Sequence, residues 1–132
     1  MISNFAPSAK FVYVPIELEQ LTPMEESKLN LKDSPTLKDF QNYVAELVKE
    51  RGFEKETLPQ VFMLFLEECG EMAKAARKTQ NIKSDKNSTD YCLSHEIADV
   101  FIFLLDICNH CGVDLERAFR EKEEINKKRV WE

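Results

Sequence analysis

VFMLFLEECGEMAKA, residues 61–75, is an apolar run that passes directly into a segment with three carboxylates. Since an α-helix turns by about 100° per residue, residues 61–66 would point apolar side chains in every direction, as in a helix enclosed on all sides. Glu68 and Glu71 stand three residues apart and share one helical face, and Glu67 can also converge on Glu71. A buried carboxylate is costly unless it is paired or binds a metal. With few basic residues at the start of this run, the pattern predicts a bound cation.

A second stretch repeats this design. Glu96 and Asp99 again stand three residues apart, directly before the apolar run 100–105. Two such helices packed side by side would bring four carboxylates together. Oxygen donors of this kind suit a hard divalent cation, Mg²⁺ or Mn²⁺, which keeps bound waters and takes a phosphate oxygen as a further ligand. The predicted metal ligands are Glu68, Glu71, Glu96 and Asp99.

The two acidic motifs, in this order, resemble the signature of the MazG-like nucleoside triphosphate pyrophosphohydrolases. The similarity continues through CGVDLERAF, residues 111–119, into a tail with Lys122, Asn126 and Arg129, and it covers residues 36–129. The resemblance implies an all-α, four-helix-bundle-like fold of the MazG type. It also implies Mg²⁺-dependent hydrolysis of nucleoside triphosphates, including non-standard or deoxy ones, to a monophosphate and pyrophosphate. Such a reaction would clean the nucleotide pool.

The resemblance also implies roles for residues around the predicted metal. Glu67 lies just off the face that carries Glu68 and Glu71, so it would hold a second metal or orient the attacking water. Basic residues and one amide, near the end of the second helix and in the C-terminal tail, would bind phosphate oxygens, Arg129 with a bidentate fork. These phosphate-binding candidates are Lys74, Lys78, Lys122, Asn126 and Arg129. The candidates for an aromatic base-binding slot are Phe40, Tyr43 and Trp131.

Start and stop signals divide the chain into an N-terminal arm, residues 1–34, and a helical domain, residues 35–132. In the arm, residues 11–16 have strand-like content, but Pro15 limits them to an edge or an extended segment. Four helices are expected in the domain. The first runs from Ser34 as N-cap and Pro35 as first helical residue to Arg51, and the second from the capping box Thr57–Gln60 to Lys78. The third is capped by Ser88 or Thr89 and ends by Gly112, and the fourth starts at Asp114 with Leu115, Ala118, Phe119 and Ile125 toward the core.

Composition narrows the classes of protein. The chain has 132 residues, 43% of them hydrophobic and 32% charged, as expected for one soluble globular domain. A net charge of −6 argues against binding to nucleic-acid polymers or anionic membranes. Neither a signal peptide nor a membrane-spanning run is visible, so the expected compartment is the cytoplasm. The four cysteines do not indicate a disulfide framework, and Cys108 and Cys111 are expected in the core rather than at a metal or redox site.

Several alternatives stay open. Within the enzyme class, selectivity for dUTP or dCTP and hydrolysis of phosphoribosyl-ATP are both compatible with the acidic motifs. A helical interaction protein without catalysis would use the N-terminal arm as its contact. A carboxylate-bridged di-iron bundle is disfavoured, because its helices carry Glu-x-x-His pairs and this sequence has none. Helices that are apolar on all sides in so short a chain favour a homodimer or a homotetramer.

Overall fold

The computed structural model describes residues 27–83, 85, 87 and 91–130, and within these ranges it contains four helices and no strand. The all-α fold class is therefore confirmed. The helices are α1, Leu37–Glu50, α2, Leu58–Thr79, α3, Leu93–His110, and α4, Leu115–Asn126. The strand-like stretch 11–16, the two residues predicted to cap the third helix and the aromatic candidate Trp131 lie outside the described residues.

The start of α1 differs from the prediction. Thr36, not Ser34, is the N-cap, and the helix begins at Leu37. The reason is a reciprocal capping box: the Asp39 carboxylate accepts the Thr36 backbone N–H at 2.7 Å, and the Thr36 hydroxyl accepts the Asp39 N–H at 3.3 Å. Lys32 reinforces this arrangement through an ion pair of 2.7 Å with Asp39. The reciprocal hydrogen bonds of Thr36 and Asp39 thus stabilise a helix start at Leu37 more than a single capping serine at position 34 would stabilise an earlier one.

Two of the other helix starts follow the sequence signals. The Thr57 backbone N–H donates to Gln60 Oε1 at 2.8 Å, which confirms the capping box of α2. Asp114 is the N-cap of α4, because its Oδ1 accepts the backbone N–H of Arg117 at 2.9 Å. The third start was predicted too early: α3 begins at Leu93, with Cys92 as its N-cap.

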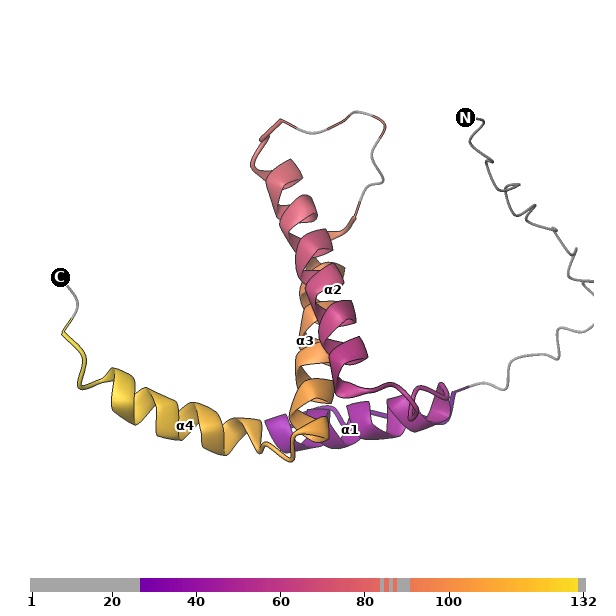
Figure 1. Ribbon diagram of the computed structural model, residues 1–132, viewed down its shortest axis with the longest axis vertical. Helices are drawn as coiled ribbons and strands as arrows, with labels where there is room; N and C mark the ends of the chain where they lie inside the picture. The colour runs from indigo at the N-terminus through magenta and orange to yellow at the C-terminus, as the bar shows by residue number, and fades with distance from the viewer. Residues whose placement is uncertain (1–26, 84, 86, 88–90, 131–132) are drawn as a thin grey trace, which may run out of the picture.

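The helices pack around an antiparallel pair (Figure 1). α2 and α3 stand side by side, α1 crosses their lower end, and α4 contacts α1 and extends away from the pair. The core lies where α1, α2 and α3 meet, with Val44, Val61 and Leu105 fully enclosed. The chain before α1 also runs along that helix, since the Lys28 N–H donates to the Glu50 carboxylate at 3.3 Å. All four cysteines are free thiols. Cys108 lies in the core as expected, but Cys111 is exposed at the end of α3, so the expectation is wrong for that residue.

A single chain does not enclose the apolar run of α2. Phe62, Met63 and Leu66 are exposed, Leu66 to 65% of its surface. The prediction that this part of the helix is enclosed on all sides is therefore wrong for a single chain. The same holds for α4, where Phe119 and Ile125 face outward instead of into the core. None of the helices in the described parts of the chain is long and apolar enough to cross a membrane.

Candidate functional site

Three of the four predicted metal ligands lie together between α2 and α3. One carboxylate oxygen from each of Glu68, Glu96 and Asp99 lies within 4.8 Å of the other two. The antiparallel packing of α2 on α3 brings the two acidic motifs face to face, because each motif points its carboxylates along one helical face. The side-by-side arrangement expected from the sequence is therefore present for these three residues.

Burial and mutual repulsion perturb this cluster. Glu96 is only 6% exposed, and its Oε2 is enclosed without a hydrogen-bond partner. Desolvation raises the pKa of the Glu96 carboxyl, and the charges of Glu71 and Asp99 add to this effect. Desolvation likewise raises the pKa of Glu68, with further contributions from Asp99, Glu71 and Glu96. His95 opposes the shift at Glu96, but burial and the neighbouring acids outweigh it, so the pKa values of both Glu68 and Glu96 are raised.

Glu71, the fourth predicted ligand, lies at the edge of the cluster beside Tyr91. Its hydrogen-bonding interaction and its charge raise the pKa of the Tyr91 hydroxyl. The Nζ of Lys74 lies 4.8 Å from the centroid of the same ring, a cation–π contact. Tyr91 therefore joins one predicted phosphate-binding residue to the acidic cluster. It precedes α3 by two residues, and neither helical periodicity nor a motif marked it as a site residue.

The donor set fits a hard divalent cation. Mg²⁺ and Mn²⁺ take carboxylate oxygens and usually only a few of them, with water or phosphate completing the coordination. The orphaned Oε2 of Glu96 is a buried acceptor that a cation would satisfy. Glu67, by contrast, is exposed on α2 and is not part of the group of close carboxylates.

A cavity of about 280 Å³ opens next to the acidic cluster. It lies between α1, α2 and α3, and Asp99 lines it together with Leu64, which precedes Glu68 by one helical turn. The rest of its wall is mostly apolar and aromatic. Its other lining residues are Val44, Leu47, Val48, Arg51, Phe53, Glu56, Ile102, Phe103 and Asp106.

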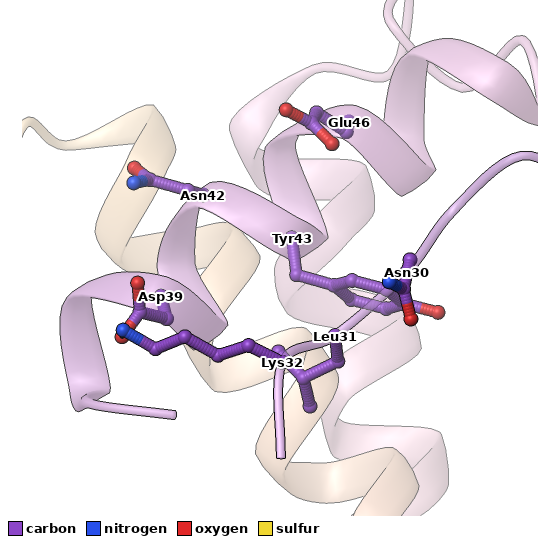
Figure 2. A pocket seen from close by; sticks show the side chains of 7 residues that line it. All are labelled: Asn30, Leu31, Lys32, Asp39, Asn42, Tyr43 and Glu46. Atoms are coloured by element: carbon purple, nitrogen blue, oxygen red, sulfur yellow. The ribbon is translucent and has the colours of Figure 1, made fainter. Parts of the chain in front are cut away.

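The aromatic candidates Phe40 and Tyr43 do not line this cavity. Phe40 packs edge-on against Phe101, with ring centroids 5.5 Å apart. Tyr43 lies in a separate groove, where its ring reaches toward Asn30 while Lys32 extends to Asp39 (Figure 2). The aromatic side chains that line the cavity are instead Phe53 and Phe103. These two residues line the cavity because of the way α1, α2 and α3 pack together. The spacing of aromatic residues within one helix does not predict such packing.

The C-terminal candidates do not reach the cluster within one chain. Lys122 and Asn126 lie on α4, which extends away from the α2–α3 pair (Figure 1). Arg129 lies beyond the end of α4, so the predicted helical stripe of three residues is limited to the first two. Lys78 lies one turn beyond Lys74 on α2, and it is half-buried.

Comparisons with known proteins find relatives that are named as nucleotide hydrolases. No protein-family model matches the chain. Over 107 residues it is 31% identical to dCTP pyrophosphatase 1 of Homo sapiens. The aligned region covers 77% of this chain and 63% of that protein. Over 106 residues it is 28% identical to a dATP/dGTP diphosphohydrolase of Salmonella phage PMBT28, covering 80% of this chain and 31% of that protein. The chain thus spans less than two thirds of the length of these relatives. Their names support the resemblance carried by the acidic motifs: this chain is similar, over most of its length, to enzymes that hydrolyse deoxynucleoside triphosphates.

Proposed function

We propose that this protein is a MazG-like pyrophosphohydrolase that cleaves nucleoside triphosphates between the α and β phosphates with the help of Mg²⁺. The observation that carries the proposal is the cluster of Glu68, Glu96 and Asp99, whose carboxylate oxygens lie within 4.8 Å of one another. In the family that the motifs resemble, such a cluster serves this reaction, and the similarity to a dCTP pyrophosphatase agrees with it.

In this proposal Glu68, Glu96 and Asp99 hold the cation, and Glu71 joins them from the edge. Bound Mg²⁺, or Mn²⁺ in its place, would offset the charge that builds up on phosphate oxygens and would lower the pKa of a bound water. Glu67 is exposed next to Glu68 and is assigned to the attacking water or to a second metal. Lys74 lies over the Tyr91 ring beside Glu71, and in this proposal it would bind the outer phosphates.

The nucleoside part of the substrate would enter the cavity that Asp99 lines. Its volume of about 280 Å³ lies just under the ~300 Å³ at which pockets for drug-sized ligands begin. This volume suits one base and part of a sugar, with the triphosphate outside at the acidic cluster. Phe53 and Phe103 offer aromatic surface to the base. We infer deoxynucleoside triphosphates as substrates, in line with the names of both relatives, and hence a role in cleaning the nucleotide pool.

The complete site would contain a second copy of the chain. The exposed apolar residues Phe62, Met63 and Leu66 lie beside the acidic segment of α2, and burying them in a dimer or tetramer removes this surface from water. Because α4 extends away from its own acidic cluster, we assign Lys122, Asn126 and Arg129 to phosphate contacts in a neighbouring copy. The same assembly would cover the outward-facing Phe119.

The test is release of pyrophosphate from a panel of ribo- and deoxynucleoside triphosphates, with Mg²⁺ and with a chelator. We expect Mg²⁺-dependent formation of monophosphate and pyrophosphate in equal amounts. Glu96→Gln should lower kcat at least about a hundredfold, because the buried ligand of the cation is lost. Glu54→Gln, the same change at an exposed position, is the matched control. Release of orthophosphate alone would contradict the proposed cleavage site, and turnover of phosphoribosyl-ATP alone would move the proposal to that branch of the superfamily.

A further inference from the structure

A second carboxylate lies in the same cavity, away from the acidic cluster. Asp106 is 7% exposed and lines the cavity together with Asp99. Along α3 the residues Asp99, Ile102, Phe103 and Asp106 follow the spacing i, i+3, i+4, i+7, so they share one face of the helix. At about 1.5 Å per residue, the seven residues from Asp99 to Asp106 span about 10 Å. The α3 face of the cavity therefore carries two carboxylates, Asp99 of the acidic cluster and Asp106 about two helical turns further along.

Asp106 has little compensation for its burial. The imidazole of His110 is a neighbour on the same helix, and its Nε2 lies 3.8 Å from the Asp106 Oδ1, beyond a good hydrogen bond. Desolvation raises the pKa of the Asp106 carboxyl, and the neighbouring His110 opposes this shift. The other charged groups that line the cavity are Arg51 and Glu56, from the end of α1 and the α1–α2 connection. A buried carboxylate in this setting gains from any N–H donor that a ligand brings.

We propose that Asp106 selects the nucleobase by accepting a hydrogen bond from its exocyclic amino group. This inference rests on the proposed function and adds a specificity residue to it. An ionised carboxylate only accepts hydrogen bonds. The 4-amino group of cytosine donates to such an acceptor, as Asp and Glu do with cytosine N4 in nucleic-acid recognition. Uracil and thymine present a carbonyl oxygen at the same position, which would face the carboxylate and leave it unpaired.

The distance from Asp99 to Asp106 matches this assignment. It is comparable to the distance between the α-phosphate and the Watson–Crick edge of a nucleotide, so a substrate held at the acidic cluster can reach Asp106 with its base. Phe103 lies between the two carboxylates on the same helical face and can pack against the ring. Along α3 the cavity wall thus offers a carboxylate of the acidic cluster, an aromatic side chain and a second carboxylate, which would meet the phosphate, the ring and the amino group of a nucleotide in turn.

The first experiment compares ligands that differ only at the 4-position of a pyrimidine. With Mg²⁺ present, calorimetry should show that dCMP binds at least about tenfold more tightly than dUMP. The pyrimidin-2-one deoxynucleotide, which lacks the amino group and adds no bulk, should bind as weakly as dUMP. The corresponding triphosphates should show the same ratio in kcat/KM for pyrophosphate release.

The second experiment changes the protein. Asp106→Asn should bring the dCMP to dUMP ratio close to one, because an amide can donate to the carbonyl oxygen of uracil as well as accept. Asp33→Asn, the same substitution at an exposed position, should keep the wild-type ratio. Circular dichroism establishes that the Asp106 variant is folded, and if it is not, the three-ligand comparison on the wild-type protein decides alone.

Each outcome separates this inference from the proposed function. Turnover without a preference for the amino-bearing base, or a preference that survives in Asp106→Asn, overturns the role of Asp106 and leaves the proposed function intact. A preference for dUMP overturns it as well, and indicates a protonated Asp106 that donates to the carbonyl. If triphosphates are not hydrolysed but the monophosphates bind with the expected ratio, the proposed function fails and the role of Asp106 stands. If neither monophosphate binds and no triphosphate is hydrolysed, both are wrong.

Discussion

Asp39 and Glu96 are two carboxylates whose surroundings shift their pKa values in opposite directions. Hydrogen bonds from Lys32 and from Thr36 lower the pKa of Asp39 from 3.8 to about 2. Desolvation and the neighbouring acids raise the pKa of Glu96. The fold stabilises Asp39 as an anion, so this carboxylate contributes to the stability of the folded state. The second is held in a state that a cation would relieve, as expected at a site that binds one.

The lowered pKa of Asp39 predicts how stability depends on pH. Because the folded-state pKa lies below the unfolded value, Asp39 stabilises the fold above pH 4, and this contribution is lost as the pH falls from about 4 to about 2. Asp39→Asn should therefore melt a few degrees below the wild type at pH 7, and the difference should shrink toward pH 2. Melting curves followed by circular dichroism measure it. Asp33→Asn, which changes the same charge outside the capping box, should show a much smaller difference, and equal effects of the two variants would contradict the argument.

At the scale of single residues, the sequence predicted part of the site. The i, i+3 spacing predicted that the acids of each motif share one helical face, and with the two helices packed side by side it predicted that Glu68, Glu96 and Asp99 lie close together. The sequence did not single out Tyr91 beside the cluster, or Asp106 in the adjoining cavity, for different reasons. Tyr91 precedes the helix, where no period applies, and Asp106 has no second acid three or four residues away on α3. Their positions depend on tertiary contacts.

Between elements, one buried side chain holds the junction of α1, α3 and α4. The Gln41 amide donates to the Val113 carbonyl oxygen at 2.8 Å, and its Oε1 accepts the Leu115 N–H at 3.1 Å. The Asn109 side chain donates to the Gln41 carbonyl oxygen at 2.9 Å. These bonds fix the turn between α3 and α4 against α1, and so they set the direction in which α4 leaves the helix pair.

This junction predicts a large effect of a nearly isosteric change. Gln41→Leu leaves the Val113 carbonyl and the Leu115 N–H without partners, and each buried unsatisfied group costs about 1–3 kcal/mol. We expect a loss of about 2–4 kcal/mol in the free energy of unfolding, measured in urea. Asn42→Leu, the same replacement at the exposed neighbouring position, should change it by less than about 0.5 kcal/mol. A loss below about 1 kcal/mol in Gln41→Leu would mean that the junction does not depend on this amide.

The helix boundaries show what local signals can and cannot decide. Thr57 with Gln60, and Asp114, are caps whose partners lie within one turn, and the structure contains both as predicted. Ser34 was wrong because Thr36 is paired with Asp39, a competing box that a single cap residue does not reveal. The start of α3 was wrong because polar residues of the preceding connection offered several equivalent caps. The local sequence therefore predicts a helix start reliably only where a single capping residue or capping box is present.

At the scale of the whole molecule, the apolar pattern predicted burial but not what provides it. The run 61–66 on α2 was expected to be enclosed, yet Met63 and Leu66 are exposed in the single chain. Phe119 on α4 is exposed in the same way, although its helix is amphipathic. Periodicity identifies a face that avoids water, and it does not say whether the same chain or another copy covers that face.

If a second copy covers α2, charges placed on this surface should separate the subunits. We expect the wild-type protein to have at least twice the 15.4 kDa mass of one chain by size-exclusion chromatography with light scattering. Met63→Lys combined with Leu66→Lys should shift the mass toward that of one chain, because burying two ammonium groups in an apolar interface is strongly unfavourable. Ile82→Lys, the same kind of change at an exposed apolar residue after α2, should leave the mass unchanged. A folded wild-type monomer at micromolar concentration would contradict the shared site, and Lys122 and Asn126 would then have no route to the acidic cluster.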